Sequence, residues 1–320
     1  MSLEPAAPQP APQAPLKLAG LEGSNPLGFL AALGVLQVLG SDERGAGLCM
    51  EWRASESAWT PALSTQDGGV IGEDWVLQTL ESGLSLDVKS HSAHLLARLS
   101  EDKNGSRRLV FLEQLDAGNS ANRDRMDWLA ALASDFAPSQ ETNQLQTARR
   151  DNHYKNLASI IKATTKEHLR RSLFARWDYA DALANQSLHL DPGEDRRYAY
   201  QWNMPSGDRD RQRFGGMLGA NRLAIEAISL FTSIPEGGAL KTVGFTGNRA
   251  NDTRWSWPIW SPPLSLPIIR SVLCLADLQA EPIDGLRRLR LREQGIVAVF
   301  RSSRILVQKT PNFTPAQRIA

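Results

Sequence analysis

Residues 26–39 read PLGFLAALGVLQVL, a run in which apolar side chains occupy nearly every position. A helix over this run is apolar on all sides, so it must be buried on all sides. With about 14 residues it is too short to cross a bilayer, because a spanning helix needs roughly 20. Ser24 or Asn25 is suited to cap its start, Pro26 suits its first turn, and Gly40 suits its exit. The run therefore predicts a buried core helix around which the other elements pack.

The composition is that of an ordinary globular protein, with 42% hydrophobic and 22% charged residues among 320. This length allows one large domain or two, at the usual ~100–200 residues per domain. Cys49 and Cys274 are isolated and form no CxxC pattern, which favours a reducing compartment such as the cytoplasm. Residues 1–17 predict a disordered Pro/Ala-rich tail, because they lack the basic start and apolar run of a signal peptide.

The remaining chain mixes helical and extended patterns. Helices are predicted over 73–81, 109–115, 125–133, 151–179, 221–231 and 266–278. A strand and hairpin are predicted over 48–60, and strands over 240–245 and 255–260. Segments 296–300 and 305–307 predict a hairpin with its bend at Ser302-Ser303. Pro258 favours an edge strand or an extended segment over a central strand.

These elements predict an α+β fold in two regions. Residues 18–188 are expected to form a mainly helical region with a small sheet. Residues 189–320 are expected to form a mixed α/β region with antiparallel strands. The two regions are free to share one core.

The net charge of +1 conceals an uneven distribution. Residues 241–320 hold twelve Lys or Arg and five Asp or Glu, a balance of +7. Residues 149–176 hold eight basic residues and two acidic ones, a balance of +6. Basic blocks in a nearly neutral chain indicate a localised anionic partner. The alternative is a charged helix face that is simply solvated.

The stretch from His189 to Phe231 combines six arginines with spaced aromatic residues and a glycine cluster ahead of a helix. This combination is typical of a surface for phosphates and stacked bases. The alternative is a connector whose arginines pair with nearby acids, Asp191, Glu194, Asp195, Asp208 and Asp210. The candidate nucleic-acid-binding residues, here and just beyond, are Arg196, Arg197, Tyr198, Arg209, Arg211, Arg213, Asn221, Arg222, Lys241, Arg249 and Trp255.

The residue types suit different parts of a nucleic acid. Arginine matches a phosphate because its planar fork donates two parallel hydrogen bonds. Asn221 is suited either to an adenine edge or phosphate, or to capping a helix. Trp255 is a candidate for base stacking, although tryptophans more often fill cores, and Trp257 and Trp260 are assigned to the core.

Catalytic signatures do not emerge from the sequence. It contains no GxxxxGK[ST], HExxH or GxSxG motif, and its glycine cluster lacks the lysine and hydroxyl of a phosphate loop. A metal-dependent nuclease assembled from His189, Asp191 and Glu194 stays open as a lesser alternative. We expect no catalytic residues, no metal and no cofactor.

Several segments resemble the large subunit of the type I-G (formerly I-U) CRISPR Cascade effector. These are LAGLEGSNPLGFLAALGVLQVL from Leu18, LDPGEDRRYAYQW from Leu190, GANRLAIEAISLF from Gly219, RWSWPIWSP from Arg254, FRSSR from Phe300 and NFTP from Asn312. Residues 86–151 take no part in the resemblance.

The resemblance implies a non-enzymatic antiviral subunit in a cytoplasmic, RNA-guided ribonucleoprotein complex. Such a subunit helps recognise target double-stranded DNA, stabilises the R-loop and recruits a helicase-nuclease. Its implied partners are the guide RNA-bound backbone subunits, the helicase-nuclease and the target DNA, with no membrane. The alternative is a scaffold that joins other subunits without touching DNA.

Overall fold

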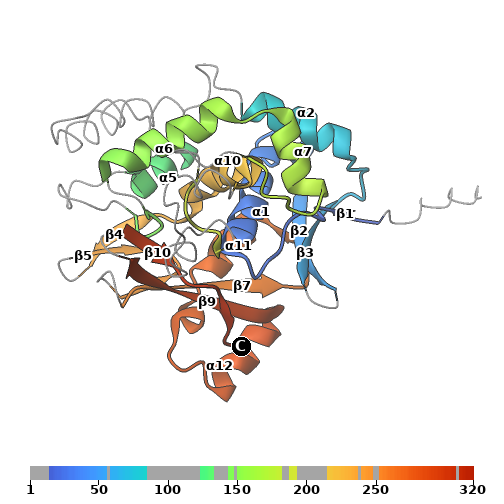
Figure 1. The fold of residues 1–320 in the computed structure, drawn as a ribbon. Helices are drawn as coiled ribbons and strands as arrows, with labels where there is room; N and C mark the ends of the chain where they lie inside the picture. The colour runs from blue at the N-terminus through green and yellow to red at the C-terminus, as the bar shows by residue number, and fades with distance from the viewer. Residues whose placement is uncertain are drawn as a thin grey trace, which may run out of the picture.

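The structure, a computed structural model, describes residues 14–55, 58–84, 123–132, 143–147, 150–181, 187–192, 215–236, 239–247, 252–307 and 310–320. The predicted helix over 109–115 and most of the predicted N-terminal tail lie outside these ranges. The predicted α+β class is confirmed. Figure 1 shows two central helices between outer helices and a sheet: α1 (Pro26–Leu39) and α10 (Leu218–Ala227) in the centre, α6 (Arg150–Ala163) and α7 (Lys166–Phe174) outside, and β7 (Arg254–Trp260) with β9 (Ile296–Val307) in the sheet.

Helix α1 is buried over nearly its whole length, as its apolar sequence predicts. Asn25 caps it by accepting hydrogen bonds from the backbone of Leu27 at 2.9 Å and Gly28 at 3.2 Å. Helix α1 packs closely against α10, where a Cβ added to Gly34 would lie 1.8 Å from the carbonyl oxygen of Leu223. The glycine therefore allows the two helices to touch backbone to backbone.

An aromatic cluster joins α1 to strands of both sheets. Phe29 of α1 stacks on Trp52 with ring centroids 5.8 Å apart, and it lies 5.9 Å from Trp257. The indole nitrogens of two buried tryptophans donate to backbone carbonyls, Trp257 to Gly23 and Trp260 to Met50, both at 2.8 Å. The prediction that these two tryptophans belong to the core is confirmed.

The first sheet draws strands from both halves of the chain. Its antiparallel order is β1 (Leu16–Lys17), β3 (Trp59–Thr65), β2 (Leu48–Ala54) and β8 (Leu264–Ser265). The hairpin predicted over 48–60 is confirmed by β2 and β3. Because β8 comes from the C-terminal region and α1 contacts α10, residues on both sides of the predicted boundary at 188 share one continuous core.

The second sheet has the order β10 (Thr310–Phe313), β9, β7 and β6 (Phe245–Thr246), and β11 (Gln317–Arg318) also pairs with β9. A smaller core on its other face packs against α12 (Gly285–Glu293), which lies on the opposite side from α1 in Figure 1. A separate pair, β4 (Ser233–Glu236) and β5 (Ala239–Thr242), covers part of the region where one strand was predicted over 240–245.

Strand β9 corrects the predicted C-terminal hairpin. Ile296–Val307 is one continuous strand, and Ser302 and Ser303 lie in register with Trp255 and Arg254 instead of forming a bend. The Ser302 hydroxyl donates to the carbonyl of Thr314 at 2.6 Å. Bonding of this kind satisfies serine hydroxyls inside the sheet, so the Ser-Ser pair does not break the strand.

The long helix predicted over 151–179 is two helices, α6 and α7. Thr165 ends the run because its side chain and that of His168 form a reciprocal cap at the start of α7. A capping box of this kind satisfies the first backbone N–H groups of a helix and so starts a new one. The chain after Phe174 is not helical, which frees residues 175–181 to form a loop.

The other predicted helices lie close to their expected positions. The observed elements are α2 (Glu73–Gly83), α5 (Arg123–Leu132), η3 (Ile228–Leu230), α11 (Leu266–Leu273) and η4 (Ala276–Gln279). A short 3₁₀ helix, η1 (Glu43–Gly45), was not predicted. Among the described residues, no helix has both the length and the apolar character needed to cross a membrane.

Pro258 lies in a strand that is interior to its sheet, so the predicted edge position is wrong for β7 as a whole. Strand β6, however, pairs only with Trp255 and Arg254. Pro258 has no N–H to donate, and β6 does not extend far enough along β7 to need a hydrogen bond from it. The physical reason behind the prediction therefore holds locally.

Substitution of Gly34 by Ala is expected to lower the free energy of unfolding by about 1–3 kcal/mol, because the added methyl forces α1 away from α10. Urea unfolding of the purified chain measures this change. Gly285→Ala is the matched control, since nothing lies within 4 Å of its added Cβ. Equal midpoints for the two variants would contradict the close contact between α1 and α10.

Candidate nucleic-acid interface

The arginine-rich stretch leaves the described structure at Pro192 and returns at Gly215. The residues before the gap are held firmly. The side chain of Asn25, which caps α1, donates to the carboxylate of buried Asp191 at 2.9 Å. The backbone N–H of Leu188 donates to the side chain of Asn221 at 2.8 Å. The stretch therefore departs from the point where α1 begins, next to α10.

The returning end is anchored to the loop after α7. Gly216 and Asp181 exchange backbone hydrogen bonds at 2.7 and 3.2 Å. A Cβ added to Gly215 would lie 1.9 Å from the carbonyl oxygen of Tyr179, so only glycine fits there. Both ends of the stretch are consequently fixed to elements of the central core.

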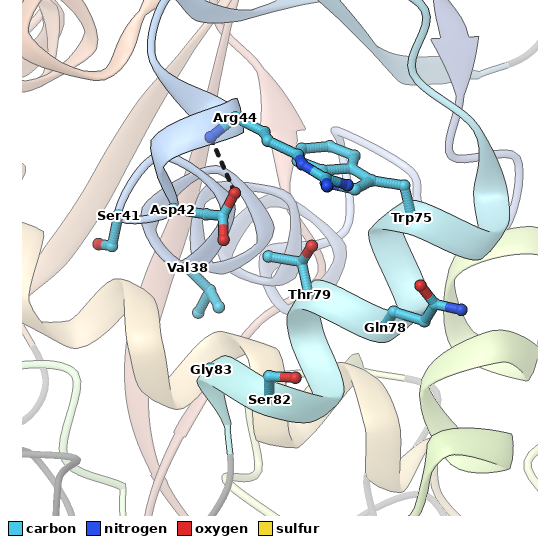
Figure 2. Close-up of a pocket in the computed structure, with 9 residues that line it drawn as sticks. All are labelled: Val38, Ser41, Asp42, Arg44, Trp75, Gln78, Thr79, Ser82 and Gly83. Atoms are coloured by element: carbon cyan, nitrogen blue, oxygen red, sulfur yellow. Dashed lines mark hydrogen bonds between the residues drawn. The ribbon is translucent and has the colours of Figure 1, made fainter.

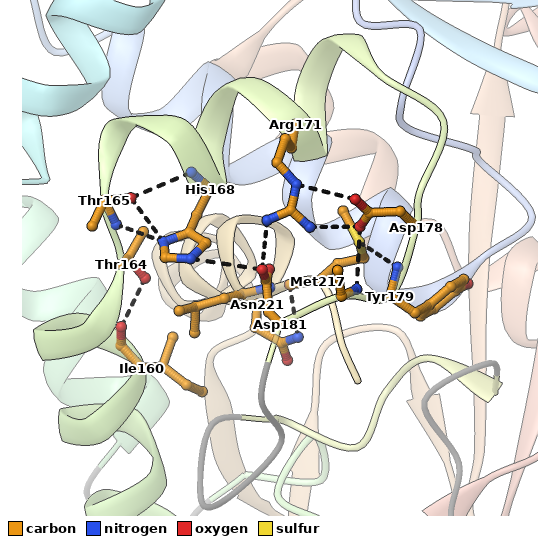
Figure 3. A network of polar contacts seen from close by, with 12 residues as sticks. Ile160, Thr164, Thr165, His168, Arg171, Asp178, Tyr179, Asp181, Met217 and Asn221 are labelled. Atoms are coloured by element: carbon orange, nitrogen blue, oxygen red, sulfur yellow. Dashed lines mark hydrogen bonds and ion pairs between the residues drawn. The ribbon is translucent and has the colours of Figure 1, made fainter. Parts of the chain in front are cut away.

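The carboxylate of Asp181 is the centre of a polar network that holds this loop (Figure 3). One oxygen accepts from the Arg171 guanidinium at 2.6 Å, and the other accepts from the backbone N–H of Leu218 at 2.8 Å. Arg171 also holds Asp178 through two hydrogen bonds, at 2.5 and 3.2 Å. His168 lies 3.6 Å from Asp181 and completes the ring of contacts.

Electrostatics reinforce the network. The hydrogen bond from Arg171 lowers the pKa of Asp178 below its ordinary value of 3.8. The same two carboxylates, Asp178 first and then Asp181, raise the pKa of the Arg171 guanidinium. Asp178 and Arg171 are therefore charged at neutral pH, and with the hydrogen bond from Arg171 to Asp181 they hold residues 178–181 against α7.

The start of α10 is already occupied by this carboxylate. A helix N-terminus attracts an anion through its free N–H groups and dipole. Here Asp181 supplies that anion from within the chain. Gly219 serves packing, since a Cβ there would lie 2.2 Å from the carbonyl oxygen of His168. The interpretation of this glycine cluster as a phosphate site is corrected accordingly.

A pocket of about 520 Å³ lies beside both anchors. Its walls come from the segment before α1, from the start of β3 and from the loop after α7, and they include Glu22, Asn25, Thr60, Arg176, Trp177 and Tyr179. The Trp177 and Tyr179 rings meet at 85° with centroids 6.1 Å apart. Figure 3 shows the Tyr179 side chain directed away from Arg171 and Asp178.

A second pocket of about 490 Å³ lies between the end of α1 and α2 (Figure 2). It is lined by hydroxyl and amide side chains together with Arg44 and the half-buried Trp75. Asp42 at its rim accepts a hydrogen bond from the backbone of Arg44 at 2.9 Å. This pocket lies at the opposite end of α1 from Asn25 and shares no lining residue with the first one.

Helix α12 presents four arginines to the surface, Arg287, Arg288, Arg290 and Arg292. Arg290 holds Asp277 in a two-pronged pair at 2.8 Å, and Arg292 makes no ion pair with any described residue. Leu286 and Leu289, one helical turn apart, are 64% and 53% exposed. The helix thus combines cations with an uncovered apolar strip.

The predicted binding residues fall into three groups. Arg196, Arg197, Tyr198, Arg209, Arg211, Arg213 and Arg249 lie outside the described residues. Lys241 is exposed, but it pairs with Glu236 at 2.8 Å. Asn221, Arg222 and Trp255 are buried in the core.

Because these three side chains are buried, the prediction that they contact a nucleic acid at the surface is wrong. Arg222 is only 2% exposed; it pairs with Glu226 at 2.5 Å and donates to the carbonyl of Leu84 at 3.3 Å. Trp255 is fully buried and stacks on Phe245 with centroids 5.7 Å apart. Asn221 lies inside α10, where it bonds Leu188 and the carbonyl of Met217, so it neither caps the helix nor faces solvent.

Sequence patterns missed the pocket residues Arg176, Trp177 and Tyr179. They were included in a predicted long helix, which would place their side chains on different faces. The available signal was an arginine followed by two aromatics at alternate positions just after a basic helix. The run RRLRLR in α12 was likewise counted only within the charge of the C-terminal region.

The residues of the lesser nuclease alternative are not brought together as a described site. His189 has a positive φ of 56° and its backbone bonds Ser187, while Asp191 bonds Asn25 and Glu194 lies outside the described residues. In the described part of the chain, no three His, Cys, Asp or Glu side chains are grouped as metal ligands.

Comparisons of the chain with protein-family models, with curated proteins and with solved structures found no match.

Substitution of Asp181 by Asn is expected to lower the free energy of unfolding by roughly 1.5–3 kcal/mol, because it removes the charged partner of Arg171 and the anion at the start of α10. Urea unfolding measures the loss. Glu167→Gln on the same side of the fold is the control, since its contact with Arg170 is long and exposed. Equal stability of the two variants would contradict the role of Asp181.

The Arg171–Asp178 contact is expected to make stability pH-dependent in acid. Because the folded-state pKa of Asp178 is lowered, its contribution is fully present above pH 3.8 and is lost as the pH falls through the lowered pKa. Unfolding free energies of the parent chain and Asp178→Asn should therefore converge as the pH falls below about 4. A difference that stays constant over this range would contradict the assignment.

Proposed function

We propose that this chain is the non-catalytic large subunit of a type I-G CRISPR surveillance complex. In that role it binds target double-stranded DNA, supports the R-loop and helps to recruit the helicase-nuclease. The observation that carries the proposal is the anchoring of the arginine-rich stretch. One end is held by Asn25 at the start of α1 and the other by Asp181 in the loop after α7, beside a pocket that adds Arg176, Trp177 and Tyr179.

The arginines suit this task on physical grounds. In the sequence, Arg196, Arg197, Arg209, Arg211 and Arg213 lie between the two anchored residues Asp191 and Gly216. Their planar guanidinium groups match phosphates through paired hydrogen bonds. Phosphate contacts position a protein on DNA without reading sequence. In an RNA-guided complex, pairing with the guide supplies the sequence recognition. A subunit of this kind therefore needs cations and stacking surfaces.

The packing of the resembling segments also supports the proposal. The segment before and within α1 touches the LDPG segment through Asn25 and Asp191. It touches the RWSWPIW segment of β7 through Trp257 and Gly23. Three of the segments that carry the resemblance are thus in contact with one another.

A docking role without DNA contact is the second candidate. The observation that favours it is α12, whose exposed Leu286 and Leu289 lie among arginines. Exposed apolar strips bordered by charges are typical of protein interfaces. Both roles place the protein in the cytoplasm, in keeping with its two free cysteines.

The proposal is tested by binding of target DNA to the guide-loaded complex reconstituted with and without the subunit. The variant Arg209→Ala/Arg211→Ala/Arg213→Ala is expected to weaken duplex binding. The slope of the logarithm of the association constant against the logarithm of the salt concentration should become shallower by the contribution of about three phosphate contacts. Helicase-nuclease recruitment is measured in parallel.

The matched variant for the docking role is Leu286→Ser/Leu289→Ser, which changes only exposed side chains. Unchanged DNA binding in the arginine variant, with recruitment lost in the leucine variant, would favour the scaffold. If omission of the subunit affects neither DNA binding nor recruitment, the proposed function is wrong.

A further inference from the structure

The pocket beside Asn25 has a size and lining that suit one nucleotide. Its volume of about 520 Å³ lies within the usual range for small-molecule sites of roughly 300–1,000 Å³. It offers flat aromatic surface, one cation, one carboxylate and a threonine hydroxyl. We propose that this pocket binds a single unpaired nucleotide whose base carries an amino group. This inference rests on the proposed function and specifies which part of the DNA the chain holds.

The aromatic corner provides the stacking surface. Trp177 and Tyr179 stand at 85° to one another, so a base stacked on one ring meets the other ring edge-on. Stacking of a base on an aromatic side chain contributes about 1–3 kcal/mol and tolerates every base. The corner therefore accounts for affinity and leaves base selection to the polar groups.

The corner is held in place before any ligand arrives. The indole nitrogen of Trp177 donates to the carbonyl of Ser172 at 3.0 Å. Arg171 clamps Asp178, the residue between the two aromatics. Tyr179 has a positive φ of 52°, and its N–H lies 3.4 Å from the sulfur of Met217. A preformed surface of this kind loses little conformational entropy on binding.

Arg176 is the natural contact for the phosphate. Its side chain is exposed at the pocket and makes no ion pair with any described residue. The other nearby arginine, Arg171, is already engaged by Asp178 and Asp181. An uncommitted guanidinium beside this aromatic corner matches the phosphate of a nucleotide whose base stacks on one of the two rings.

Glu22 selects the base. One carboxylate oxygen accepts from the backbone and hydroxyl of Ser24, an arrangement that fixes the carboxylate within the pocket wall. A carboxylate only accepts hydrogen bonds, so it favours the amino group of cytosine, as in the pairing of Glu with cytosine N4. Thymine offers a carbonyl at the same position and is repelled. The pocket should therefore prefer cytosine to thymine.

The test compares two pyrimidine ligands that differ at this position. Binding of labelled short oligodeoxycytidylate and oligothymidylate to the full chain is followed by fluorescence anisotropy at neutral pH. Binding of deoxycytidine 5′-monophosphate and thymidine 5′-monophosphate is followed by calorimetry. The cytidine ligands should bind about tenfold more tightly, since one good base-edge contact discriminates by this order.

Three variants address the three groups. Arg176→Ala should weaken both ligands about tenfold without changing the preference, because it removes a phosphate contact. Glu22→Gln should abolish the preference while retaining binding. Trp177→Ala should weaken both ligands, and Trp177→Phe should restore most of the loss. Arg292→Ala on α12 is the matched arginine control, and thermal unfolding verifies that each variant is folded.

The two ligand forms separate this inference from the proposed function. If oligonucleotides bind but the pocket variants behave like the parent chain, the pocket assignment is wrong and the DNA-binding proposal stands. If only the free nucleotides bind, with the expected variant effects, the pocket serves a free nucleotide and the DNA-binding proposal fails. If neither form binds, or thymidine ligands bind as tightly as cytidine ligands, the inference is overturned.

Discussion

The backbone contact between α1 and α10 is the constraint on which the rest of the structure depends. Gly34 allows the two helices to approach until a methyl group no longer fits between them. Helices packed this closely bury their apolar side chains completely, and each buried Leu or Phe side chain contributes about 1.5–3 kcal/mol. The outer helices, the first sheet and the aromatic cluster around Phe29 all cover this pair.

The same pair determines where the candidate interface lies. Asn25 caps α1 and at the same time holds Asp191, and Asn221 of α10 holds the backbone of Leu188. Asp181 neutralises the start of α10 and anchors Gly216. Buried polar groups must be hydrogen-bonded, and here these obligatory bonds also attach the arginine-rich stretch and shape the neighbouring pocket. Stability and site geometry are therefore supplied by the same side chains.

Local patterns predicted elements well where one physical effect dominates. The all-round apolar run could only be a buried helix, and side-chain chemistry limited its cap to Ser24 or Asn25, of which the structure uses Asn25. Predictions failed where two effects compete. Ser302-Ser303 is a common turn pair, yet the partners available in β7 and at Thr314 keep the chain extended. The basic run over 151–179 shows helical periodicity, yet the cap at Thr165 divides it.

The candidate site shows the same division more sharply. Composition and motifs directed attention to arginines and aromatics but did not separate surface from core at Asn221, Arg222 and Trp255. Trp255 and Trp177 are alike as sequence signals, but one is enclosed by Phe245 and its neighbours and the other lines a pocket. Arg222 and Arg176 also differ in burial. Arg222 is enclosed in the core with Glu226 of its own helix as partner, whereas Arg176 lines the pocket.

The sequence by itself determined the α+β class, the buried central helix and the position of its cap to within two residues, because periodicity, hydrophobicity and capping act within a few residues of one another. Only the tertiary structure decided which cations remain available and which aromatics meet at a corner. Those properties depend on partners far apart in the chain, such as Asn25 with Asp191 and Arg171 with Asp181, across loops whose course no local pattern specifies.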